Sequence, residues 1–172
     1  MMTLTFTFWM LVAIFAVIGA MRGWAKELLV TFSAILALFI IAVLARYVPP
    51  LRDFFAPPNG TMEFWVETFI MLALVFFGYQ TPNISRFAGN KFARERFADT
   101  LLGLFLGALN GYLIVGSIWY FMAQSNYPYP QFISKPVPTP PIVAYLPPEW
   151  LGIPTIYFAV ALSFLFVLVV FI

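Results

Sequence analysis

The chain has 172 residues, of which 63% are apolar and only 9% are charged. A soluble domain is about half apolar and a quarter charged, so nine basic and seven acidic side chains cannot cover a domain of this size in water. The composition predicts an integral membrane protein and excludes disordered, coiled-coil and collagen-like chains. The net charge of +2 gives no indication of a nucleic-acid partner.

Two residue types are absent, cysteine and histidine. Their absence removes disulfides, thiolate nucleophiles, the Ser-His-Asp and Cys-His arrangements, and the commonest ligands of zinc and haem. No paired catalytic carboxylates occur within one apolar stretch, and no glycine-rich phosphate loop follows a strand pattern. The sequence therefore predicts no enzyme activity, no metal site and no cofactor.

Five apolar stretches are long enough to cross a hydrocarbon layer, which takes about 20 residues of helix. They are continuously apolar rather than alternating, which favours helices over a β-barrel. No basic residue precedes the first stretch, so it is interpreted as a retained membrane helix rather than a signal peptide. The predicted fold is an all-α polytopic transmembrane bundle with spans near 4–21, 27–45, 64–80, 100–123 and 153–172.

The connections differ in character. Residues 22–26 form a very short turn, which predicts that the first two spans are antiparallel neighbours. Residues 124–152 carry eight of the fourteen prolines, which predicts an extended, proline-rich external loop rather than a second domain.

The basic residues predict the orientation. One side carries six of them and the other three, Arg46, Arg52 and Lys135. The richer side is predicted to be cytoplasmic, with the amino terminus and the proline-rich loop outside and the carboxyl terminus inside. The six basic residues on the richer side are Arg22, Lys26, Arg86, Lys91, Arg94 and Arg96. They either bind lipid headgroups or only set the orientation of the protein. Segment 86–99, which contains four of them, is either an interfacial helix or a solvated loop.

Five tryptophans lie near the predicted span ends, as expected of an aromatic belt at the membrane interface. They are Trp9, Trp24, Trp65, Trp119 and Trp150.

Three glycines spaced by four residues, Gly103, Gly107 and Gly111, predict a groove in the fourth span that lets another helix come close. Packing within the same chain is favoured over a dimer or partner seam. A shorter pair, Gly19 and Gly23, is expected to permit the tight turn.

Two polar residues fall within spans. Asn110 is expected to form an interhelical hydrogen bond rather than to bind substrate or conduct ions. Glu67, one helical turn beyond Glu63, is the candidate intramembrane carboxylate for a proton or cation. Alternatively, Glu67 reaches the outer interface or pairs with Arg46 or Arg52.

Two motifs carry a family resemblance. Residues 19–27, Gly-Ala-Met-Arg-Gly-Trp-Ala-Lys-Glu, resemble the G-x-x-R-G-x-x-[KR]-E turn of CvpA-type (colicin V production) membrane proteins. Residues 99–115 are similar to that family's D-[RK]-x-L-G-x-x-x-G-A-x-[RK]-G-x-L-I-V segment, with Thr100 and Asn110 in place of usually basic residues. The resemblance covers about residues 1–123, leaves out the loop and fifth span, and implies a bacterial inner-membrane protein linked to colicin V production and envelope upkeep.

The leading functional interpretation is a non-catalytic membrane protein that acts by helix packing and by association with other membrane subunits or with itself. The first alternative is an accessory structural subunit of a larger respiratory, photosynthetic or secretion complex. The second is a small channel or transporter that uses Asn110 and Glu67.

Overall fold

The protein folds into helices, without a strand in the described part of the chain. The computed structural model describes residues 3–48, 50, 60–80, 93–133 and 135–171, without the side chains of residues 93–95, 170 and 171. The helices, in chain order, are α1 (Leu4–Arg22), α2 (Trp24–Tyr47), α4 (Gly60–Tyr79), α5 (Ala93–Gln124), the 3₁₀ helix η2 (Pro141–Tyr145), α6 (Pro147–Trp150) and α7 (Thr155–Phe171). The predicted all-α bundle is confirmed.

Four helices, α1, α2, α4 and α5, are long and apolar enough to cross a membrane. Their positions agree with the first four predicted spans, although α5 begins at Ala93 rather than near residue 100. The charged residues ahead of that span are good helix formers, so the helix does not end where apolarity ends. The 17 residues of α7 extend about 26 Å, somewhat less than a ~30 Å hydrocarbon layer, and a fifth span there stays a prediction.

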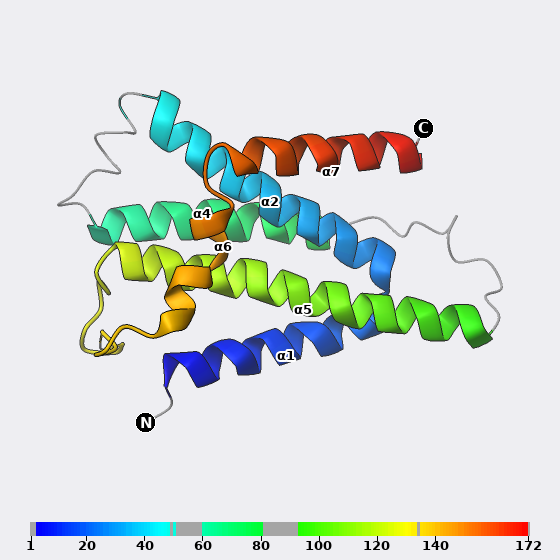
Figure 1. Cartoon of the computed structure of the whole chain (residues 1–172), viewed down its shortest axis with the longest axis horizontal. Coiled ribbons are helices and arrows are strands. Elements are labelled where there is room, and N and C mark those ends of the chain that lie inside the picture. The colour runs from blue at the N-terminus through cyan, green and yellow to red at the C-terminus, as the bar shows by residue number, and fades with distance from the viewer. Residues whose placement is uncertain (1–2, 49, 51–59, 81–92, 134, 172) are drawn as a thin grey trace.

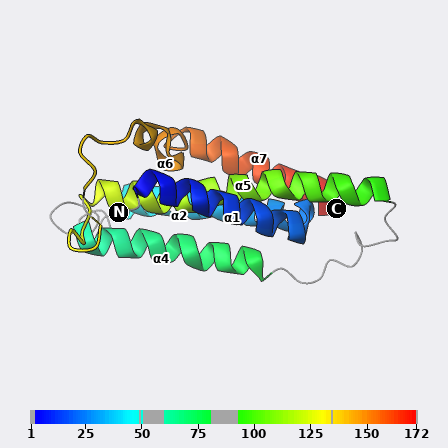
Figure 2. The same cartoon turned by 90° about the horizontal axis from the view of Figure 1, so that it is seen from below.

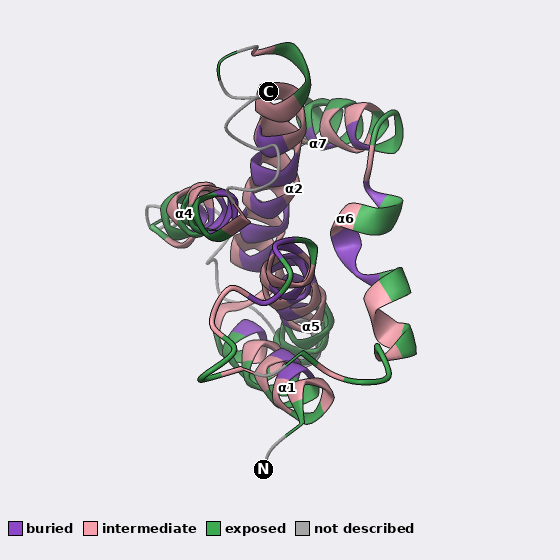
Figure 3. Ribbon diagram, turned by 90° about the vertical axis from the view of Figure 1, so that its left-hand side faces the viewer, coloured by how far each residue is buried: buried purple, intermediate pink, exposed green. Residues whose placement is uncertain are grey.

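The helices form three layers, as Figure 1 and Figure 2 show from two directions. The middle layer contains α1, α5 and α2, with α5 between the other two; α4 covers one face, and η2, α6 and α7 cover the other (Figure 3). The predicted packing of the first two spans on each other is therefore wrong. They touch only near their shared turn, because the glycine face of α5 takes up α1.

The burial pattern is that of a protein in hydrocarbon. The apolar core joins α2, α4 and α5, with Val30, Ala34 and Met71 fully buried. Several polar side chains are buried as well, whereas large apolar residues such as Val17 and Phe69 are exposed. Apolar side chains that face outward and polar ones that face inward match a bilayer solvent.

The proline-rich segment is less extended than the sequence predicts. Its second half forms η2 and α6 and packs on α5, where the Pro147 ring covers Gly116 and Leu146 is fully buried. The Tyr112 hydroxyl donates to the Tyr145 carbonyl and accepts from Trp150 Nε1 at 3.0 Å. Tyr112 lies about 18 Å along α5 from its last residue, so this half of the loop lies level with the span rather than beyond its end.

Candidate functional site

The two sequence motifs meet in space at the junction of α1, α2 and α5, which we call the motif corner (residues 19–31 and 99–111). Its first component is a backbone contact between α1 and α5. A Cβ built on Gly19 would lie 2.6 Å from the Gly107 Cα, and one built on Gly103 would strike the Gly19 carbonyl oxygen. Gly111 continues the contact against Phe15. Gly19 therefore belongs to this seam, and Gly23 alone makes the turn.

The turn between α1 and α2 is the second component. Gly23 has φ +85°, a conformation that L side chains rarely adopt, and it is the single residue between the two helices. Asp99 of α5 lies against it and accepts a hydrogen bond from the Trp24 backbone N–H at 3.2 Å. A carboxylate at the first N–H groups of α2 also stabilises the helix dipole.

The third component is a buried polar cluster between α2 and α5. Glu27 and Asn110 are both fully buried. The Asn110 amide donates to the Glu27 carboxylate Oε2 at 2.8 Å and to the Glu27 carbonyl oxygen at 2.9 Å, and its own oxygen accepts from the Thr31 hydroxyl at 2.7 Å. Both amide hydrogens and one lone pair of the amide oxygen are thereby used between helices.

Arg22 connects this cluster to α4. Its Nε lies 3.5 Å from Glu27 Oε1. The Glu27 side chain of this ion pair is fully buried, whereas 21% of the Arg22 side chain is exposed. The same guanidinium donates to the Tyr79 carbonyl oxygen at 3.3 Å and lies 4.2 Å from the centre of the Tyr79 ring. An orphan carbonyl at the end of α4 is thus satisfied by a cation, which also suits the helix dipole.

The other predicted basic residues contribute little to the corner. Lys26 lies on α2, and Arg96 is exposed on the first turns of α5, beside the exposed Phe97. Segment 86–99 is thus helical from Ala93 onward. Arg86 and Lys91 lie outside the described residues, as does the side chain of Arg94.

A second polar group lies at the opposite end of α5. Gln124 donates to Glu63 Oε1 at 3.2 Å, and Glu67 is buried with its Oε2 lacking a hydrogen-bond partner among the described residues. Arg46 is exposed and lies over the Tyr47 ring rather than beside Glu67, while Arg52 is outside the described residues. From the helix rise, Glu67 and Asn110 are separated by roughly 15 Å along the bundle.

Sequence reasoning missed two contributors to the structure. From the sequence, Glu27 is interpreted only as the last residue of the first motif, and its burial is not predicted. A carboxylate followed by eighteen uncharged residues is itself a signal of burial. Trp119, assigned to the aromatic belt, is instead buried against Phe8 with ring centroids 5.6 Å apart. Only its position near a span end suggested the belt, and that position does not reveal which face it occupies.

These observations define a class of protein: a multi-pass membrane protein in which the polar residues of the two motifs bond between its own helices. The sequence profile described as colicin V production protein matches residues 4–147, so the chain belongs to that family. The match extends past residue 123 and includes most of the proline-rich loop, further than the two motifs indicate. Among curated proteins and solved structures, none is significantly similar to this chain.

Proposed function

We propose that this colicin V production family protein acts in the bacterial inner membrane as a non-catalytic scaffold, through helix packing and association with partners. The observation that carries the proposal is the motif corner: Arg22, Glu27 and Asn110 bond to one another across three helices. A side chain that catalyses must reach a substrate, whereas Glu27 and Asn110 are sealed from the surface and hold helices together.

The surface best suited to a partner is on α7. This helix packs mainly on α2 and exposes seven large apolar residues, four of which lie at intervals of four, three and four, the spacing of a helix–helix seam. We call them the α7 stripe: Phe158, Leu162, Leu165 and Val169. Another membrane subunit, or a second copy of this chain, would pack its own helix along the stripe.

The orientation of the protein in the inner membrane is part of the proposal, and the basic residues support it. Lys26 and Arg96, together with Arg22, lie at the end of the bundle where α1 ends and α2 and α5 begin. The positive-inside rule places that end in the cytoplasm. The amino terminus and the start of α7 then face outward.

Site-specific photocrosslinking tests the proposal. A photoreactive residue at Leu165 should give adducts of discrete mass in native membranes, and one at Phe76, equally exposed on α4, should give none beyond lipid. Two differently tagged copies distinguish self-association from a foreign subunit. Equal labelling from both positions, or none from Leu165, would refute the α7 stripe. Loss of colicin V production with Leu165→Ala but not Phe76→Ala would connect the surface to the family's role.

The two alternatives make different predictions. An accessory subunit of a large complex would give adducts with several neighbours and would be degraded without them. A channel needs polar groups along one path, whereas the Glu67 and Asn110 groups lie roughly 15 Å apart along the bundle, with buried apolar residues such as Leu113 and Ile114 on α5 between them.

A further inference from the structure

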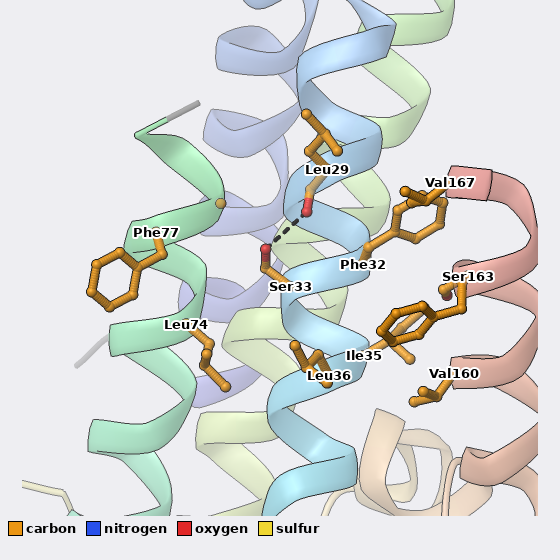
Figure 4. Close-up of a pocket in the computed structure, with 12 residues that line it drawn as sticks. Leu29, Phe32, Ser33, Ile35, Leu36, Leu74, Phe77, Val160, Ser163 and Val167 are labelled. Carbon is orange, nitrogen blue, oxygen red and sulfur yellow. Dashed lines mark hydrogen bonds between the residues drawn. The ribbon is translucent and has the colours of Figure 1, made fainter. Parts of the chain in front are cut away.

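An apolar groove runs between α4 and α7 over the outer face of α2. Its cavity volume is about 430 Å³, and the side chains of Leu29, Leu36, Leu74 and Val167 line it (Figure 4). The groove exists because α4 and α7 lie on opposite sides of α2 and are not packed on each other. It opens toward the surrounding bilayer rather than into the core.

The chemistry of the groove selects a hydrocarbon occupant. Its two hydroxyl groups are already satisfied within their own helices: Ser33 donates to the Leu29 carbonyl oxygen at 2.9 Å and Ser163 to the Ala159 carbonyl oxygen at 2.8 Å. The rest of the lining offers apolar side chains and Gly78. A polar occupant would therefore lose its hydrogen bonds on entry.

The size of the groove suits part of one acyl chain. Leu29 and Leu36 lie about 10 Å apart along α2, which sets the length of the groove. Its cavity volume of about 430 Å³ far exceeds the roughly 10–15 Å³ that one water needs, so a run of methylene groups fits along it.

The depth of the groove matches one leaflet. Lys26, Leu29, Ser33 and Leu36 follow one another on one side of α2 at intervals of three or four residues. Lys26 and Leu36 are about 15 Å apart along the axis, which is half of the ~30 Å hydrocarbon layer. The groove thus begins at Leu29, about one helical turn after Lys26 along α2, and reaches toward the middle of the bilayer.

A lysine lies at the mouth of the groove. Arg22, one turn away, is matched by Glu27, whereas Lys26 forms no ion pair with any other described residue. The Cα–Cβ bond of a helical residue tilts toward the amino end, so the Lys26 side chain extends toward the headgroup layer.

We propose that the groove of α2, α4 and α7 is a binding site for one acyl chain of an anionic phospholipid whose phosphate contacts Lys26. The lipid belongs to the leaflet at the amino end of α2. It fills the space that the helices leave open and holds α7 in place on α2. This inference uses the membrane setting of the family but not the α7 stripe, which is on the other side of that helix.

The test uses the whole chain, gently extracted and analysed by native mass spectrometry with phosphatidylglycerol or phosphatidylcholine added. We expect phosphatidylglycerol to be retained in preference, and Lys26→Gln to reduce that preference about fivefold, with Lys26→Arg restoring it. Lys135→Gln removes the same charge from an exposed position elsewhere and should change nothing. Equal retention of both lipids by the unmodified chain would overturn the proposal.

Filling the groove tests the acyl chain separately. Leu36→Trp should abolish retention of both lipids, whereas Leu72→Trp, on an exposed part of α4, should not. If Leu36→Trp unfolds the protein, the unmodified chain still gives an answer with a phospholipid that carries a photoreactive acyl chain. Adducts on residues 29–36 and 160–167 support the site; adducts spread evenly over exposed α1 residues such as Val17 overturn it. Failure here would leave crosslinking from Leu165 unchanged, so the two proposals fail independently.

Discussion

Replacing Gly107 by alanine tests whether the α1–α5 seam holds the bundle together. The new Cβ would lie 2.9 Å from the Gly19 Cα and 3.1 Å from the Gly19 nitrogen, and it would also strike the Phe15 carbonyl oxygen. Carbon atoms in good contact are about 3.5–4.0 Å apart, so α1 must move away by somewhat less than 1 Å. All of the opposing atoms belong to backbone, which cannot rotate aside.

Two opposing effects set the magnitude. Alanine raises helix propensity by about 1 kcal/mol over glycine, while overpacking a well-packed interface costs typically 1–3 kcal/mol. We expect a net loss of about 1 kcal/mol for Gly107→Ala and several times more for Gly107→Leu, which separates the helices. Gly19→Ala disturbs the same contact, so the double variant should lose less than the sum.

The assay is reversible unfolding in mixed micelles, followed by circular dichroism as the share of denaturing detergent rises. Ala13→Leu, which adds bulk on an exposed position of α1, should stay within about 0.5 kcal/mol of the unmodified protein. If Gly107→Ala is instead stabilised by the full helix-propensity gain, and Gly107→Leu unfolds like the unmodified chain, the close approach of α1 and α5 is refuted.

Three further predictions use the same unfolding assay or a flux measurement. Asn110→Leu leaves the buried Glu27 carboxylate without a donor and should destabilise the protein by about 3 kcal/mol; adding Glu27→Leu should recover part of the loss, and simple additivity would contradict the cluster. Gly23→Ala forces a side chain into positive φ and should lose about 1–2 kcal/mol, whereas Gly152→Ala, whose Cβ would meet only ordinary van der Waals contacts, should lose almost nothing. Glu67→Gln should leave proton and cation flux into vesicles unchanged, and a lost flux would favour the channel alternative.

The helices were largely predictable because hydrocarbon imposes one strong rule, that an apolar run of sufficient length becomes a spanning helix. Helix ends were less predictable. The start of α5 at Ala93 depends on helix propensity in water rather than on apolarity. The prediction for the proline-rich segment was also incomplete. Proline composition predicts an extended chain, whereas Leu146 and Pro147 pack on α5 at Gly116.

Which helices touch could not be inferred from the apolar runs. A short turn suggested that α1 packs on α2, yet the glycine spacing on α5 was the stronger determinant, since only glycine lets two backbones approach so closely. The glycine spacing predicted that something would approach, not that its partner would be Gly19. Burial of Trp119 is likewise a property of the assembled bundle.

The motif corner explains why the two motifs occur together in one chain. Gly19 meets Gly103 and Gly107, and Asp99 meets the turn at Gly23, so neither motif could form its contacts without the other.

Position 110 shows how this chain departs from the family pattern without losing the contact. A basic residue, usual there in the resembling motif, would face Glu27 directly as an ion pair. Here Asn110 donates two hydrogen bonds to Glu27, and Arg22 supplies the positive charge from the neighbouring helix. A buried carboxylate needs both donors and a counter-charge, and in this chain Asn110 supplies the donor and Arg22 the charge. Arg22 also contacts Tyr79, so in this chain it links the polar cluster of the corner to the end of α4.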